Sequence, residues 1–211
     1  DQAVTCIPVA PALKNDLPEI ENTLRIDING AIVRFGDKQF SENYIQGVDP
    51  SFFDFFSFKL LKGDPATALA DPYNIILTES MAKKYFGDKD PLGESLRIFQ
   101  YDPDGQGAEY KITGIVEDCP PNSHFRYNFL FSFKTIEAVY PDAFGYNGWF
   151  NNGYYTYIML KSGASAEQLQ SKLTTFLEKY IGSDMKKNKV YWSYFLQPLT
   201  GIHLKSNLRY E

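Results

Sequence analysis

Cys119 and His124 come nearest to a reaction centre in their types and spacing, because a thiol beside an imidazole can act as a nucleophile. The four residues between them, PPNS, predict a turn and impose no particular geometry on the pair. The nearby sequence offers no identifiable residue that would orient the imidazole. The pair therefore does not predict catalysis.

Acidic side chains give no metal site by their spacing. Residues 102–105 read DPDG, like the start of a calcium loop, but the twelfth position is Thr113 instead of a bidentate Glu. Asp88, Asp90 and Glu94 surround a Pro-Leu-Gly turn and are typical turn formers. With 2 His and no Cys-x-x-Cys spacing, a dedicated zinc site is not expected. Among the 26 Asp and Glu residues, no pair stands out as catalytic.

Nucleotide and hydrolase motifs are missing as well. The sequence contains neither GxGxxG, nor a phosphate loop, nor GxSxG. We therefore expect a chain that is not an enzyme and has no cofactor site of its own.

Composition indicates a globular, acidic protein. Its 211 residues can bury a sizeable core, and the 44% hydrophobic and 22% charged fractions argue against disorder. A net charge of −5 argues against nucleic acid or an anionic membrane surface as a partner, since both attract clustered Lys and Arg. The one basic cluster, KKNK at 186–189, is predicted to be a solvated loop.

The sequence shows no membrane span or signal peptide of its own. No run approaches the ~18–20 apolar residues that cross a bilayer. The chain begins at Asp1 without an initiator Met, so we expect an excised fragment or a mature segment.

Two cysteines, Cys6 and Cys119, allow at most one internal disulfide. An oxidising compartment would permit it, and the sequence does not say whether the geometry does. The alternative is that both are small buried side chains.

Aromatic residues are abundant, with 17 Phe, 15 Tyr and 2 Trp. They either build the core or form an exposed patch that meets a partner. The Phe residues at 52, 53, 55 and 56 cannot all face one side of a short helix, so some could be exposed. The richer candidate for a partner or substrate contact is the loop containing Phe144, Tyr146, Trp149 and Phe150. The alternative is that these four rings cover the core beneath a long loop.

The hydrophobic pattern predicts mixed helices and strands. In chain order these are a helix over 11–22; strands over 24–28, 31–35 and 38–48, with a turn at 29–30; a short helix after 49–50; a helix over 78–86; two strands flanking a hairpin at 102–107; strands over 127–133 and 154–160; a helix over 166–181; and a strand over 191–197. Asp49, Thr78 and Ser165 are predicted helix caps, and Gly87 and Gly182 are predicted helix ends. Without regular βαβ alternation or internal repeats, the fold class is α+β.

Five short phrases follow one another between residues 47 and 118. They are GVDPSFFDFF at 47–56, LLKGD at 60–64, ILTESMAKKYFG at 76–87, DPLGE at 90–94 and ITGIVED at 112–118. In this order and spacing they resemble the extracytoplasmic (MacB-like periplasmic core) domain of MacB/FtsX-type ABC transporter permeases. The resemblance is strongest over 44–118 and extends more loosely through 123–125 and 197–204.

The resemblance implies a two-lobed domain. A porter-like α+β lobe would be built from both chain ends, residues 1–46 and 123–211. A mixed β/α lobe, residues 47–122, would be inserted within it.

It also implies a function in transport, with efflux as the process and mechanotransmission as the role of this domain. ATP would be used by a cytoplasmic ATPase subunit or domain, and this domain would meet a substrate or a periplasmic or outer-membrane partner. A second permease copy would be expected. The domain would lie between transmembrane helices at the periplasmic face of the bacterial inner membrane. The alternatives are a free-standing secreted ligand-binding module with an aromatic surface, and a hydrolase whose catalytic residues are not evident.

Overall fold

The computed structural model describes residues 2–102 and 104–202. Its strands are β1 (Thr5–Cys6), β2 (Ile20–Phe35), β3 (Lys38–Val48), β4 (Leu60–Lys62), β5 (Asn74–Thr78), β6 (Ser95–Ile98), β7 (Ala108–Val116), β8 (Phe129–Ser132) and β9 (Asn152–Leu160). Its helices are α1 (Val9–Asp16), α2 (Phe52–Phe55), α3 (Glu79–Phe86), α4 (Lys134–Val139) and α5 (Ala166–Asn188), with 3-10 turns η1 (Pro141–Phe144), η2 (Tyr146–Phe150) and η3 (Leu199–Gly201). The predicted α+β class is confirmed. The end of the predicted 197–204 phrase lies outside the described residues.

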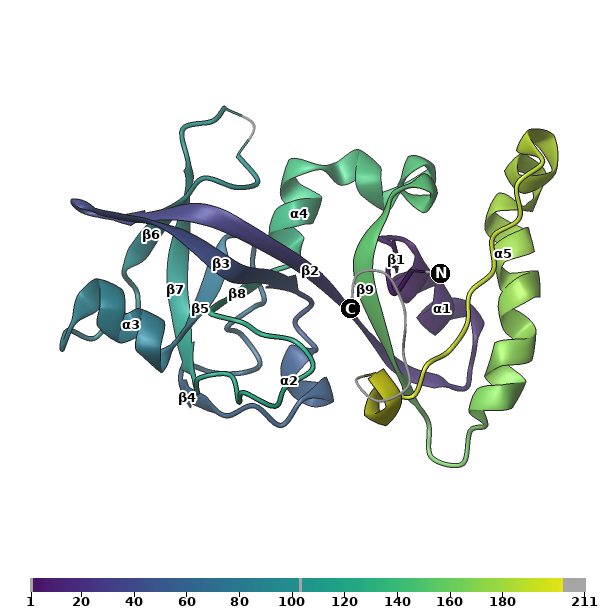
Figure 1. Ribbon diagram of the computed structural model, residues 1–211, viewed down its shortest axis with the longest axis horizontal. Coiled ribbons are helices and arrows are strands. Elements are labelled where there is room, and N and C mark those ends of the chain that lie inside the picture. Colours follow the sequence, from purple (N-terminus) through teal and green to yellow (C-terminus); the bar gives the residue numbers. More distant parts are fainter. Residues whose placement is uncertain (1, 103, 203–211) are drawn as a thin grey trace.

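The long strand β2 runs through the whole molecule (Figure 1). Its first part pairs with β9, and its second part pairs with β3. The predicted turn at Asn29 and Gly30 is wrong, because the chain passes straight through it as a bulge. The opposing residue Tyr44 takes up the irregularity with φ +60°. The hairpin turns instead at Gly36, whose φ of +56° suits a tight loop.

Six strands form a closed ring in the order β2–β3–β8–β5–β7–β6 and back to β2. Alternation along β5 shows its two faces: Ile75 and Leu77 belong to the cluster inside the ring, and Ile76 belongs to a second cluster outside it. The outer cluster lies beneath α2, where Phe52 is fully buried. We call this ring, with α2, α3 and α4, the ring half.

The helical half comprises β1, α1, β9 and α5 together with the first part of β2. Its core is a third cluster between α1, α5 and the sheet, including Leu13, Leu173 and Leu177. Figure 1 shows α5 lying at the opposite end of the molecule from α3. The predicted lobe boundaries at 47 and 122 stay predictions.

Three helix ends differ from the predictions. Helix α1 occupies 9–16 and not 11–22, since Ile20 already begins β2. Helix α5 continues through Gly182 to Asn188, because Gly182 and Met185 are buried on its packed face. Its left-handed cap is Lys189.

The predicted strand at 191–197 is extended but does not join a sheet. It packs along α5, where the Gln170 side chain donates to the Tyr194 carbonyl at 2.9 Å and accepts from the Leu196 amide at 2.6 Å. The caps at Thr78 and Ser165 are confirmed, since each hydroxyl accepts a helix amide.

Gly63, in the LLKGD phrase, is required by its surroundings. Its φ is +97°, and an added Cβ would lie 2.4 Å from the Thr113 carbonyl oxygen. We expect Gly63→Ala to lower the free energy of unfolding by about 2 kcal/mol, measured by urea denaturation. Gly93→Ala is the control, because Gly93 has φ +84° with open space around it. Equal losses in the two variants would show that the contact with Thr113 contributes nothing.

Candidate functional site

Cys119 and His124 do not form a nucleophile pair. The Cys119 thiol donates to the Phe125 carbonyl at 3.3 Å, and the His124 ring bonds the Tyr157 hydroxyl at 3.0 Å. Each group is therefore engaged with a different partner. Within residues 2–102 and 104–202, no group of three His, Cys, Asp or Glu side chains could hold a metal ion.

The two cysteines are free thiols in separate parts of the core, so the disulfide that the sequence left open is not formed. Cys6 is fully buried in the helical half, 3.6 Å from the Tyr194 hydroxyl. Cys119 packs beside the cluster under α2.

We expect the two thiols to react at different rates. Burial raises the pKa of the Cys6 thiol, which lowers its thiolate fraction as well as its access to reagent. With a thiol-specific maleimide at pH 7.5, Cys119 should be labelled first, and Cys6 only after unfolding. Peptide mass spectrometry on non-reduced protein would check this order. An absence of label at both sites in denaturant would show a disulfide and contradict the structure.

The four predicted contact residues divide into two pairs. Trp149 is 4% exposed and stacks on Tyr180 with a centroid distance of 4.4 Å. Phe144 is partly buried and lies over the Arg25 guanidinium at 5.3 Å. These two rings pack against the hydrophobic core and are not available as a contact surface.

Tyr146 and Phe150 are on the surface, 53% and 44% exposed. Their rings meet edge to face, 5.7 Å apart, and the Tyr146 hydroxyl donates to Asp184 of α5. The Phe residues at 52, 53, 55 and 56 are different: none is exposed, and the last three are partly buried around Phe52. The surface aromatic candidate is therefore reduced to Tyr146 and Phe150.

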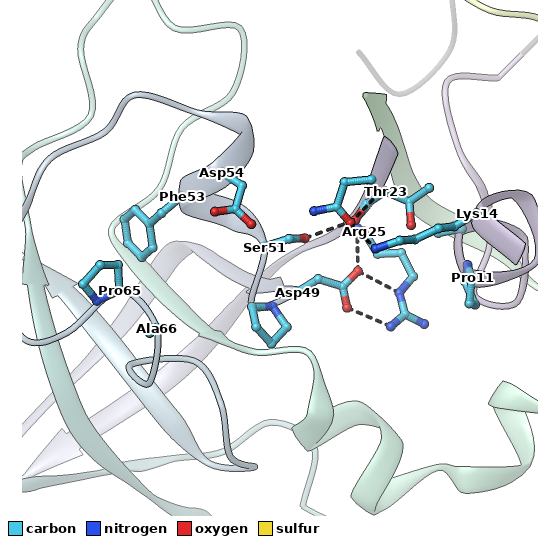
Figure 2. Close-up of a pocket in the computed structure, with 13 residues that line it drawn as sticks. Pro11, Lys14, Thr23, Arg25, Asp49, Ser51, Phe53, Asp54, Pro65 and Ala66 are labelled. Atoms are coloured by element: carbon cyan, nitrogen blue, oxygen red, sulfur yellow. Dashed lines mark hydrogen bonds and ion pairs between the residues drawn. The ribbon is translucent and has the colours of Figure 1, made fainter. Parts of the chain in front are cut away.

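A groove of about 730 Å³ lies between the two halves of the molecule (Figure 2). Its floor is the early part of β2, its first wall is α1, and its second wall is the segment leading into α2 together with Pro65 and Ala66. Its polar lining residues include Lys14, Thr23, Arg25, Asp49, Ser51 and Asp54.

Arg25 and Asp49 form a two-pronged ion pair at the floor of this groove. The Asp49 carboxylate accepts from Arg25 Nη2 at 2.7 Å, from Nε at 3.0 Å and from the Arg25 amide at 2.8 Å. The side chains are 13% and 15% exposed. The Arg25 guanidinium also lies 4.1 Å from the centre of the Phe133 ring. The pair thus attaches the start of the α2 segment to β2.

The predicted role of Asp49 as a helix cap is therefore wrong. The α2 N-cap position is Ser51, and its hydroxyl donates to the Thr23 carbonyl at 3.1 Å instead of capping. The sequence signal for polar contacts here was the pair Arg25 and Asp27. They are two residues apart in a strand and therefore lie on the same face of β2.

The exposed groups at the groove carry opposite charges. Lys14 of α1 donates to the Asn22 side chain at 2.7 Å, and Asp54 belongs to α2. Figure 2 shows them on opposite sides of the Arg25–Asp49 pair. Since Asp49 and Ser51 are engaged with β2, they hold the two halves together, and Lys14 and Asp54 are the charged groups at the groove that remain exposed.

Asp27 is a second buried polar group on β2. It is 7% exposed and accepts from the Tyr101 hydroxyl and the Asn29 side chain. Burial raises the pKa of the Asp27 carboxyl to about 6, although both hydrogen bonds oppose the rise. The contact holds Tyr101, which follows β6 with φ +49°, against the ring half.

Comparisons with known proteins agree with one another. The MacB-like periplasmic core domain family matches residues 5–176. A solved domain of a protein described as a permease, from Porphyromonas gingivalis, is 28% identical with a TM-score of 0.70, covering 87% of this chain and 80% of that one.

Two more distant solved structures share the fold. The periplasmic region of MacB from Actinobacillus actinomycetemcomitans is 18% identical with a TM-score of 0.60, covering 88% of this chain and 83% of that one. The extracellular domain of the noncanonic ABC-type transporter YknZ from Gram-positive bacteria is 13% identical with a TM-score of 0.61, covering 94% and 91%. Among curated proteins, none matches significantly. Over the described residues, no helix has the length and apolar character needed to cross a membrane.

Proposed function

Because the chain belongs to the MacB-like periplasmic core domain family, we propose that it is the non-catalytic extracytoplasmic domain of an ABC transporter permease. In this role it couples ATP hydrolysis on the cytoplasmic side to the handling of a substrate or partner outside the inner membrane. The observation that carries the proposal is the family match over residues 5–176.

The proposed partners follow from that role. A cytoplasmic ATPase subunit or domain uses the ATP, so the domain itself needs no cofactor. A second permease copy completes the transporter, and a periplasmic or outer-membrane protein is a further partner. The domain lies between transmembrane helices, and its function is mechanotransmission during efflux.

The groove supports the mechanical part of this proposal. It lies where the helical half and the ring half meet on β2, with Lys14 from one half and Asp54 from the other. A small rotation of one half relative to the other would change the distance between the two walls of the groove. The contacts of a substrate or partner bound in the groove would then change as well.

The assignment is tested by the sequence of the parent protein. One hydrophobic span before residue 1 and about three after residue 211, each of about 20 residues, are expected. A reporter enzyme that is active only outside the cytoplasm, fused after residue 211, should be active. A signal peptide before the chain and a stop codon soon after it would overturn the assignment.

Coupling is tested in the purified full-length transporter. Reversing the exposed groove charges with Lys14→Glu and Asp54→Lys should change the rate of ATP hydrolysis about fivefold. The matched control reverses Lys62 and Asp90, an exposed ion pair at 3.1 Å outside the groove. Hydrolysis that is unchanged in the groove variant, or changed equally in the control, would contradict a role for the groove in coupling.

A further inference from the structure

The end of α5 and the turn η2 form one exposed surface, which we call the aromatic–basic surface. Its members are Tyr146, Phe150, Lys186, Lys187, Lys189 and Tyr191. Tyr191 is 89% exposed, the highest value among the exposed large hydrophobic residues of the described chain. An aromatic side chain so far in solvent contributes little to the core, and together with exposed Tyr146 and Phe150 it is available for a contact outside the domain.

Direct contacts make the surface continuous. The Tyr146 hydroxyl bonds Asp184 in the last turns of α5. The Phe150 ring lies 6.1 Å from that of Trp192, the residue after Tyr191. The Trp192 amide in turn donates to the Met185 sulfur at 3.4 Å.

The charge of this surface differs from that of the whole chain. Lys186, Lys187 and Lys189 are exposed, and none forms an ion pair within the described residues. The acid nearest to them in sequence, Asp184, accepts from the Tyr146 hydroxyl and lies within electrostatic reach of Lys187, so the three lysines outnumber it on this surface. The net charge of −5 is a sum over 211 residues, whereas contact with a charged surface depends on charges within about 10 Å at 0.1 M salt.

The surface also lies beside the beginning of the described chain. Cys6 of β1 pairs with Asn152, two residues after Phe150, and its sulfur contacts Tyr194. In the proposed function a transmembrane helix precedes this strand, which would bring the surface near the bilayer.

We propose that the aromatic–basic surface contacts the anionic phospholipid surface of the bilayer, an inference that rests on the proposed function. Lysines attract anionic headgroups, and Tyr and Trp favour the headgroup level because their rings are apolar with a polar edge. The lysines also complement the C-terminal end of the α5 dipole, but that role needs no exposed Tyr191 beside them.

Flotation of the 211-residue chain with vesicles tests the inference. Dioleoylphosphatidylglycerol vesicles should bind the protein at 50 mM salt and release it at 500 mM, and dioleoylphosphatidylcholine vesicles should not bind it. Replacing Lys186, Lys187 and Lys189 with Gln should weaken binding at least about tenfold. Tyr191→Ser combined with Phe150→Ser should weaken it as well, by removing the aromatic contact.

The matched control replaces Lys59, Lys83 and Lys89 with Gln, which changes the net charge equally on the ring half. Binding should then remain unchanged. Equal weakening by both lysine variants, no effect of the Ser variant, or no binding to the anionic vesicles would each overturn the inference. The outcome is separate from the test of the proposed function, which depends on the flanking sequence and not on vesicles.

Discussion

Asp49→Ala is expected to lower the free energy of unfolding by about 3 kcal/mol at pH 7. The substitution removes the carboxylate that accepts three donors from Arg25. The guanidinium would remain largely out of water, 13% exposed and packed on Phe133, with its partner lost. Urea denaturation followed by circular dichroism measures the change.

The control for this prediction is Asp90→Ala, which removes an ion pair with Lys62 whose side chains are 48% and 59% exposed. Its stability should change little, because water replaces both exposed partners of Asp90, the Lys62 ammonium and the Leu92 amide. If Asp49→Ala were no more destabilising than this control, the pair would not hold the α2 segment to β2.

Asp27→Asn is expected to stabilise the protein at pH 7.5 by about 3 kcal/mol. Burial raises the pKa of Asp27 from 3.8 to about 6, so ionised Asp27 opposes folding above that pH. Its protonation in acid removes the cost. The contribution of Asp27 to the stability of the parent protein should therefore rise as pH falls from about 6 to about 4. This rise should be absent from the variant.

Urea titrations of both proteins at pH 4, 5, 6 and 7.5 measure this dependence. The carbonyl oxygen of the Asn side chain can still accept from the Tyr101 hydroxyl, so the substitution removes the charge and keeps this hydrogen bond. Asp37→Asn, at the exposed β2–β3 turn, is the control and should leave the curve unchanged. A variant that is less stable than the parent protein at pH 7.5 would show that the carboxylate is held by its hydrogen bonds more strongly than burial opposes it.

Much of the fold followed from local patterns in the sequence. Thr78 and Ser165 cap helices as their positions predict, and β3 occupies its predicted residues. The family was also evident from the order of five short phrases. The LLKGD phrase contains Gly63, whose close approach to the Thr113 carbonyl admits no side chain.

The errors arose where distant residues decide the local structure. Asp49 has the position of a helix cap, but Arg25, 24 residues earlier, takes its carboxylate. Gly182 would end an isolated helix, yet the buried face of α5 continues past it to Met185.

Residues 191–197 show a related error. Their alternating pattern is real, since exposed Tyr191 is followed by partly buried Trp192, but the buried side faces α5 instead of a sheet. A period of two reports which side chains are covered and not what covers them. The groove was missed for the same reason, because its walls come from segments far apart in the chain.

The continuous strand β2 has a consequence for how the domain unfolds. Its 16 residues hydrogen-bond to β9 in one half and to β3 and β6 in the other, so neither half keeps a complete sheet without the other. The two halves should therefore melt in a single cooperative transition. Amide protons from β9 and β3 should show the same opening free energy in native-state hydrogen exchange. A gene encoding only one half would then yield an insoluble product, and the domain would be inherited as one indivisible folding unit.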